Sequence, residues 1–176
     1  MGLFMRAIPL TVTAVAAALL LTACNGGGNN GSGGKNSSAC QIGGVSLQVG
    51  AASVAPAAGD TGEVPISITN QSKTCTLENF PAVTLGQKGV SGKLPAQQGA
   101  TAQTLKLAKG DAATFTISYV RGKDGDATSL AATEMKITLP GGDSAQTFPW
   151  KYGPIAGQGA RNKPNASVSA FQQAGD

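Results

Sequence analysis

The sequence contains no histidine, the side chain that proteins use most often as a general base and as a metal ligand. Ser-His and Cys-His nucleophilic schemes are therefore excluded, and so are histidine-based metal sites. Methionine is also scarce, and Met135 is the only methionine that follows Met1 and Met5. A copper carrier with methionine ligands is not expected. We expect no cofactor, no metal and no enzymatic activity.

Charged residues are also few, at 12% of 176 residues, which is about half the usual share. The formal net charge of +4 includes Arg6, and the remaining lysines are scattered. Because no run of basic residues interleaves with aromatics, no nucleic-acid partner is expected. Glycine is abundant at 25 residues, and most of the other polar positions are Ser, Thr, Asn and Gln. This composition is typical of exported β-proteins.

The N-terminal segment has the parts of an export signal. A short start carrying Arg6 precedes an apolar stretch over residues 7–21, and small residues follow. The stretch of about 15 residues is shorter than the ~20 residues that a spanning helix needs. We therefore predict a signal peptide over residues 1–23; a transmembrane anchor is the less favoured alternative.

The four residues Leu21–Cys24, which read LTAC, resemble a lipobox, the recognition sequence of bacterial lipoproteins. The resemblance implies cleavage before Cys24 and diacylglycerol and palmitate chains on that cysteine. Several acyl chains on one residue hold a protein stably on a bilayer. We expect an exported protein that is lipid-anchored to the cell membrane or the outer membrane. An ordinary secretory signal ending near a cysteine is the alternative.

Residues 24–39 are predicted to be the lipidated cysteine and a Gly/Asn/Ser linker, which reads NGGGNNGSGGKNSSA over 25–39. A flexible chain of this length reaches about 20 Å. Two motif matches within it, G-x-G-x-x-G over 26–31 and S-x-x-K over 32–35, lack the flanking strand or helix that their chemistry requires. We interpret both as accidental.

From Cys40 onward, apolar and polar residues alternate with the period of half-buried strands. The pattern predicts about seven short strands, at 45–49, 64–68, 83–85, 105–107, 115–119, 135–139 and 148–152. We predict an all-β domain over residues 40–155, an immunoglobulin-like antiparallel sandwich, with an open barrel as the alternative. Pro65 should lie at an edge or a bulge. Residues 156–176 are predicted to be a disordered tail.

Three further groups of residues could carry a function. Cys40 and Cys75 are expected to form a disulfide, since they lack the C-x-x-C spacing of a redox pair. The segment 124–129, which reads DGDATS, hints at a calcium loop but lacks the glycine and the bidentate glutamate of an EF-hand, so a solvated turn is favoured. Trp150 is expected in the core, and an exposed aromatic platform is the alternative.

Several of these features together resemble a family of secreted bacterial lipoproteins known only as a domain of unknown function and common in actinobacteria. They are the lipobox, the linker, Cys40, a strand ending in Asn70, the segments 74–77 (TCTL) and 80–83 (FPAV), and a Lys-Gly-Asp turn before residues 112–120. The family pattern has Gly-aromatic-Pro-Gly-Val where this chain has NFPAV at 79–83, and many members carry a further cysteine pair. The resemblance covers residues 40–139. It implies an all-β, disulfide-bearing envelope domain and no particular activity.

These features favour a membrane-anchored envelope lipoprotein that is a non-catalytic binding or structural module. Its partner would be an envelope protein, a glycan or the cell wall near the membrane. A carboxylate-dependent cell-envelope hydrolase is the alternative, and it would require two close carboxylates with a raised pKa in a cleft.

Overall fold

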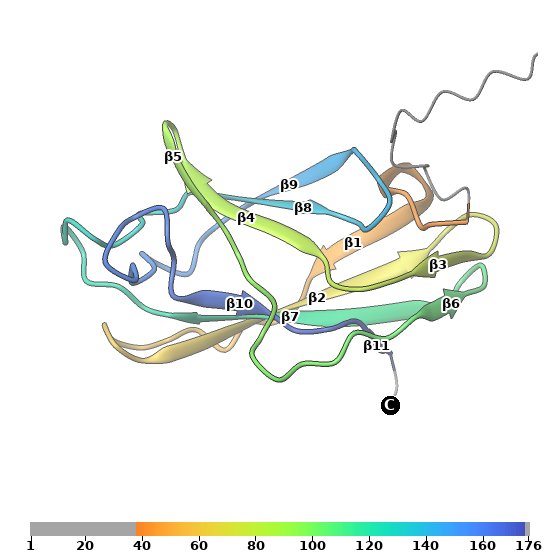
Figure 1. Cartoon of the computed structure of the whole chain (residues 1–176), viewed down its shortest axis with the longest axis horizontal. Helices are drawn as coiled ribbons and strands as arrows, with labels where there is room; N and C mark the ends of the chain where they lie inside the picture. Colours follow the sequence, from red (N-terminus) through yellow and green to blue (C-terminus); the bar gives the residue numbers. More distant parts are fainter. Residues whose placement is uncertain (1–37, 175–176) are drawn as a thin grey trace, which may run out of the picture. The chain divides into compact units, whose positions relative to one another are not determined.

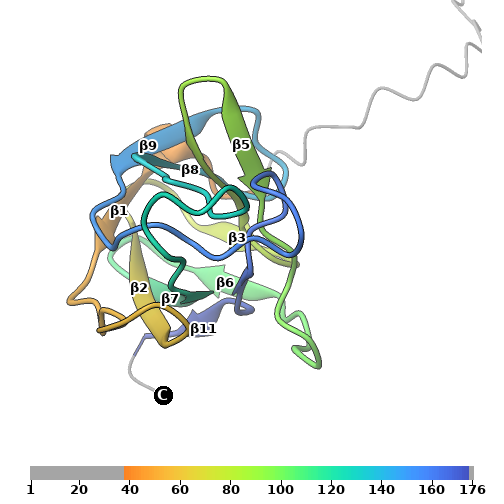
Figure 2. The same cartoon turned by 90° about the vertical axis from the view of Figure 1, so that its left-hand side faces the viewer.

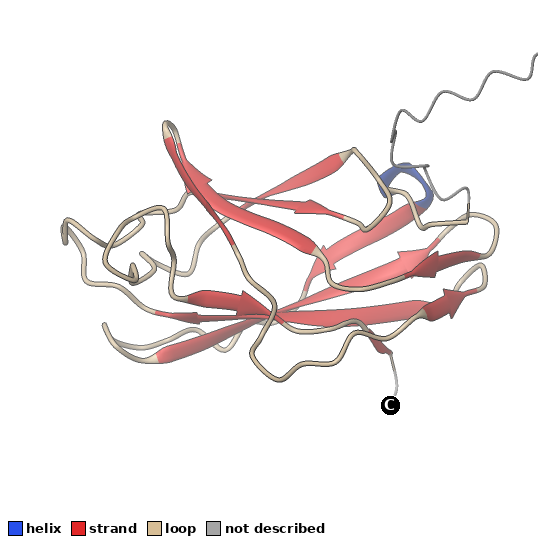
Figure 3. Ribbon diagram, in the orientation of Figure 1, coloured by secondary structure: helices blue, strands red, loops and turns tan. Residues whose placement is uncertain are grey.

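The computed structural model describes residues 38–174 (Figure 1), all of which belong to one compact unit, Gly34–Asp176. The predicted signal peptide, Cys24 and nearly all of the linker lie outside the described residues. Within residues 38–174 no helix is long and apolar enough to cross a membrane. The only helical turn in this part of the chain is a 3-10 helix, Ile42–Gly44, and the rest consists of strands and loops (Figure 3). The predicted all-β fold is confirmed.

The larger sheet is antiparallel and has the strand order β1-β2-β7-β10. Its strands are β1 (Val45–Val49), β2 (Thr61–Asn70), β7 (Ala112–Val120), β10 (Ala166–Val168) and β11 (Gln172–Gln173), which also pairs with β7. The two long strands at the centre are β2 and β7. They pair from Thr61 opposite Val120 to Thr69 opposite Ala112, along nearly their whole length.

The second sheet packs over the first (Figure 2) and has the order β5-β4-β8-β9. Its strands are β4 (Ala82–Gln87), β5 (Val90–Lys93), β8 (Glu134–Thr138) and β9 (Ala145–Pro149). A two-stranded sheet of β3 (Cys75–Leu77) and β6 (Leu105–Leu107) completes the fold. The arrangement confirms a β-sandwich, whereas the immunoglobulin-like topology stays a prediction.

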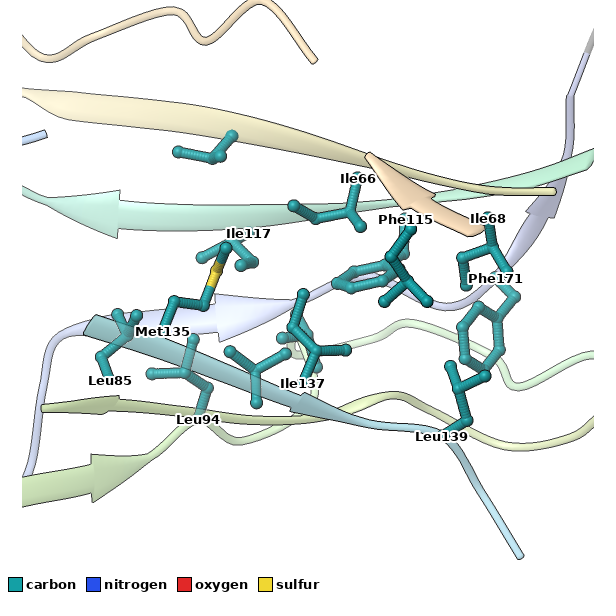
Figure 4. Packing of buried hydrophobic residues seen from close by; sticks show 14 of the residues in the cluster. Ile66, Ile68, Leu85, Leu94, Phe115, Ile117, Met135, Ile137, Leu139 and Phe171 are labelled. Atoms are coloured by element: carbon teal, nitrogen blue, oxygen red, sulfur yellow. The ribbon is translucent and has the colours of Figure 1, made fainter. Parts of the chain in front are cut away.

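The core lies between the two sheets because each long strand turns its apolar residues to the same side. On β7 the buried residues are Phe115, Ile117 and Tyr119, which alternate with partly exposed Thr116 and Ser118. Figure 4 shows Phe115 and Ile117 beside Ile66 and Ile68 of β2 and facing Met135 and Ile137 of β8. Burying each large apolar side chain contributes about 1.5–3 kcal/mol, so this layer supplies most of the driving force for folding.

Pro65 lies at a bulge, one of the two places expected for it. The backbone N–H of Gly50 donates to the carbonyl of Pro65 at 2.8 Å, but the proline has no N–H with which to return the bond. The last pair of β1 joins Val49 to Ile66, and the next bridge joins Ser53 to Glu63. Between these two pairs, three residues (50–52) follow β1, whereas only two residues of β2 (64–65) lie opposite them. One extra residue on one side of a pair is the mark of a bulge. The β1 ladder therefore ends beside Pro65, although β2 is a central strand.

The prediction of a strand over residues 148–152 was wrong in its bounds. β9 begins at Ala145 and ends at Pro149, and the N–H of Trp150 instead donates to the carbonyl of Thr133 at 2.9 Å. β3 and β5 were also missed, because such short strands show no clear alternation.

The prediction of a disordered tail over residues 156–176 was also wrong, since the structure is ordered through residue 174. β10 and β11 both pair with β7, and Phe171 between them is fully buried. The ring of Phe171 meets that of Phe115 edge to face, with centroids 5.8 Å apart. The sequence of this segment is mostly polar because only a few of its residues face the core. Those few residues nevertheless fill part of the core.

We therefore expect Phe171→Ala to lower the free energy of unfolding by about 3–5 kcal/mol, the cost of emptying a buried aromatic site. The neighbouring change Gln172→Ala, at an exposed position, should cost less than about 0.5 kcal/mol. Urea unfolding followed by circular dichroism measures both. Equal, small effects would mean that the segment after Gly153 does not belong to the core.

Candidate functional site

The expected disulfide is present, and it lies beside the first residues that the structure describes. Cys40 and Cys75 are joined, with their Cα atoms 4.9 Å apart. Beside them, Thr76 of β3 donates its N–H to Ser38 and accepts the N–H of Cys40, at 2.8 and 2.9 Å. The first described residues are thus held to β3 by a covalent bond and by backbone hydrogen bonds. We call this region, Ser38–Cys40 with Cys75–Leu77, the tether end.

Trp150 lies in the core, as expected, and does not form an exposed platform. Its side chain is 5% exposed, and its indole N–H donates to the carbonyl of Gly153 at 2.7 Å. Tyr119 and Tyr152 pack against it edge to face, with ring centroids 5.1 and 4.8 Å away. The Tyr119 hydroxyl accepts the N–H of Ala55 and donates to the carbonyl of Tyr152. The cluster joins loop segments to β7.

Burial raises the pKa of Tyr152 above its ordinary value, and the nearby Tyr119 adds to the shift. A phenol held neutral in this way suits a packed cluster better than it suits proton transfer near neutral pH. This environment gives Tyr152 a structural role in fixing the loop after β9.

The acidic segment is a closed turn. Asp126 accepts hydrogen bonds from the hydroxyl and the backbone N–H of Thr128, at 2.6 and 2.7 Å, and from the N–H of Ser129 at 3.2 Å. These bonds, with the Thr128 hydroxyl first among them, lower the pKa of Asp126. Among the described residues no group of three acidic or cysteine side chains could hold a metal ion. The favoured reading as a solvated turn agrees with this geometry.

Asp124 and Asp126 nevertheless line one small cavity of about 130 Å³ together with Lys123 and Arg161. A carboxylic acid that donates a proton needs a raised pKa, and the pKa of Asp126 is shifted in the opposite direction. The arrangement suits an ionised carboxylate that closes a turn.

One groove in the described part of the chain has a volume of about 390 Å³, within the range of small-molecule sites. It lies where β2 begins, β7 ends and β10 begins, and none of its lining residues is charged. We call it the uncharged groove. Apart from Tyr119, whose hydroxyl is bonded to Ala55 and Tyr152, its polar side chains are those of Thr61, Gln98, Ser118, Gln158, Asn165 and Ser167.

One wall of the uncharged groove is a segment that runs parallel to β10. Gln97 donates its N–H to the carbonyl of Val168, and Val168 donates its own to Pro95, at 2.8 and 3.0 Å. This pairing covers the free edge of β10 and places Gln98 at the groove. The lining also includes Gln158 and Asn165, whose amide groups are 3.4 Å apart.

The uncharged groove adjoins the outer face of the larger sheet, which carries small hydroxyl side chains. Cross-strand pairing aligns Ser167 with Ser118, and Ser67 with Thr114. Among the outward positions of these strands, Glu63 is the one charged residue. We call this surface the hydroxyl face. Its partly exposed hydroxyl residues are Ser46, Ser67, Thr69, Thr114, Thr116, Ser118 and Ser167.

The uncharged groove and the tether end lie at opposite ends of the larger sheet. Thr61 and Val120 border the groove, whereas Asn70, at the other end of β2, donates its side-chain amide to the carbonyl of Leu107 in β6, which pairs with β3. Eight residue steps along a strand span roughly 26 Å. Figure 1 shows the first described residues and β10 well separated along the length of the sandwich.

The outer face of the second sheet, unlike the hydroxyl face, carries several charged side chains. A groove of about 300 Å³ on its outer face is lined by Lys88, Lys136 and Glu134, among others, and Lys136 pairs with Glu134 at 3.1 Å. Lys93 lies opposite Thr84 in the adjacent strand. The two faces of the sandwich therefore differ in charge.

Sequence reasoning missed the uncharged groove because the segments that form it were assigned incorrectly or not at all. Gln158, Asn165 and Ser167 fall in the segment predicted to be a tail, and Gln98 falls in a long loop. The alternation over 166–168 was the available signal, but so short a run cannot be distinguished from chance.

Comparison with known protein families gives a match over most of the described residues. Residues 40–172 match the family described as "Domain of unknown function (DUF4232)", and the chain belongs to this family. The match extends beyond residue 139, where the resemblance ended, to include β9 and β10 and reach β11. No curated protein matches the chain.

One departure from the family pattern has a structural explanation. Asn79 stands where the pattern has glycine, and its φ of 62° is in the left-handed region that favours glycine. Asparagine is among the few other residues that tolerate this conformation readily.

We expect the double change Cys40→Ala/Cys75→Ala to cost roughly 3–4 kcal/mol of stability, because the two cysteines, 35 positions apart, close a loop in the unfolded chain. Reductant should lower the melting temperature of the wild type by several degrees and leave that of the double variant unchanged. Thermal circular dichroism of the full chain measures both effects. Free thiols at these positions in denatured, unreduced protein would contradict the pairing.

We expect Thr128→Val to raise the pKa of Asp126, since it removes the hydroxyl bond that lowers it most. The lowered folded pKa means that this turn stabilises the fold above the unfolded value of about 3.9, and that the contribution is lost as the pH falls through the lower folded value. Side-chain carboxyl NMR follows the titration. Ser129→Ala is the matched control, because Ser129 donates its backbone N–H; an equal shift in both variants would refute the assignment.

Proposed function

We propose that this protein is an exported envelope lipoprotein, anchored by lipid on Cys24, whose sandwich is a non-catalytic binding module. The observation that supports it best is the position of the uncharged groove at the end of the larger sheet opposite the tether end. A domain held to a membrane at the tether end presents that groove away from the lipid surface.

The dimensions agree with such an arrangement. Roughly 26 Å of sheet separates the two ends, and the linker adds a reach of about 20 Å. The uncharged groove would then lie beyond the lipid headgroups, where envelope polymers and proteins are accessible. The disulfide supports export as well, since such bonds persist mainly in oxidising compartments.

The alternative of a carboxylate-dependent hydrolase has less support. Asp60 accepts the N–H of Ala57 and Asp111 accepts the N–H of Ala108, so both carboxylates serve to close turns. Asp126 does the same, with its pKa lowered. The uncharged groove has hydroxyl and amide groups, which suit hydrogen bonding to a ligand better than proton transfer.

The proposal extends to the kind of lipoprotein and to the topology of the sandwich. We infer that the chain is a secreted lipoprotein of the kind common in actinobacteria, and that its sandwich is immunoglobulin-like. The LTAC sequence at residues 21–24 supports the first inference, and the two packed antiparallel sheets support the second.

We expect Cys24→Ser to abolish incorporation of a fatty-acid analogue in metabolic labelling and to leave the precursor uncleaved or released. Ser37→Ala, in the linker, should leave labelling unchanged. Full labelling of the Cys24 variant would show that lipid is attached elsewhere, and an unlabelled wild type would rule out the lipid anchor.

A further inference from the structure

We infer that the uncharged groove, continued by the hydroxyl face, binds a chain of an uncharged polysaccharide. The inference rests on the proposed function as a binding module and adds the chemical class of its ligand. It is carried by the charge, the hydrogen-bonding capacity and the shape of this surface.

The lining of the uncharged groove has no charged side chain, which disfavours a charged ligand. It contains no Asp, Glu, Lys or Arg, and only Glu63 is charged among the outward positions of the adjoining strands. A phosphate or carboxylate polymer would lose hydration there without gaining an opposite charge. A neutral ligand does not incur this cost.

The polar groups of the uncharged groove match those of a sugar. Hydroxyl and amide side chains both donate and accept, as sugar hydroxyls do. Four of these side chains make no hydrogen bond to any residue in the described part of the chain, so their capacity is available to a ligand: Thr61, Gln98, Ser118 and Ser167. Gln158 and Asn165 share only a long contact of 3.4 Å, which a ligand can replace.

The shape favours a polymer over a single sugar. From Ser118 at the groove, Thr116 and Thr114 follow on the same side of β7, at intervals of about 6.8 Å along the strand. Ser67 and Gln172 lie on either side of Thr114. Because these side chains are mostly small, an extended chain can lie against the sheet and continue into the groove.

The test uses the purified full chain in detergent and three uncharged probes, namely mannan, galactan and dextran, with hyaluronan as the acidic comparison. Affinity electrophoresis and NMR shift mapping measure binding at low and at high salt. The test variant is Gln158→Ala/Asn165→Ala, and the matched control is Gln71→Ala/Gln87→Ala, which removes two amides away from the groove.

The inference predicts that at least one uncharged probe binds and that hyaluronan does not. The test variant should bind about tenfold more weakly or worse, and the control should bind like the wild type. Salt should leave the affinity unchanged, since no ion pair is involved. The shifted resonances should include those of Ser118 and Ser167.

Three results would overturn the inference: no uncharged probe binds, both double variants bind equally well, or only hyaluronan binds. Sedimentation of the unlipidated Cys24→Ser variant with isolated cell envelopes separates this failure from that of the proposed function, because this variant can co-sediment only through its folded domain. Co-sedimentation without binding to any uncharged probe would refute the glycan and leave a binding module. If the protein neither co-sediments with envelopes nor binds an uncharged probe, the proposal of a binding module is refuted as well.

Discussion

The long pairing of β2 with β7 is the contact on which the rest of the domain depends. Alternation along β7 directs Phe115, Ile117 and Tyr119 into the core and leaves Thr116 and Ser118 on the hydroxyl face. A slip of one residue would exchange the two sets, burying hydroxyls and exposing rings. One register therefore fixes both the stability of the sandwich and the chemistry of its outer surface.

The two ends of this pairing serve different purposes. At the tether end, the disulfide and the bonds to β3 hold the first described residues, which restrains a segment that would otherwise fray. At the other end, the cluster around Trp150 fixes the loops near the end of β7, and the wall beside β10 shapes the uncharged groove. Rigid loops around such a groove favour binding, because little side-chain freedom is lost when a ligand is bound.

Much of the fold could be predicted from the sequence, because the strands that bury one face have a clear period of two. The bounds of β1 were predicted correctly, the core of β7 was found, and the single tryptophan and the cysteine pair were placed correctly. The uncharged groove could not be predicted. It forms where segments distant in the sequence meet, around Thr61, Gln98 and Asn165, and its hydroxyl and amide side chains have no spacing that distinguishes them from ordinary surface. The segment 166–173 was missed because its strands depend on β7 for their pairing.

Photocrosslinking in living cells tests the central claim, that the outer face of the larger sheet is the binding face. A photoreactive residue replaces Thr116 on this face in one strain, and Thr84 on the outer face of the second sheet in another. The account predicts crosslinks to sugar-containing material from position 116 and none from position 84. Crosslinks confined to position 84, or equal at both, would contradict it.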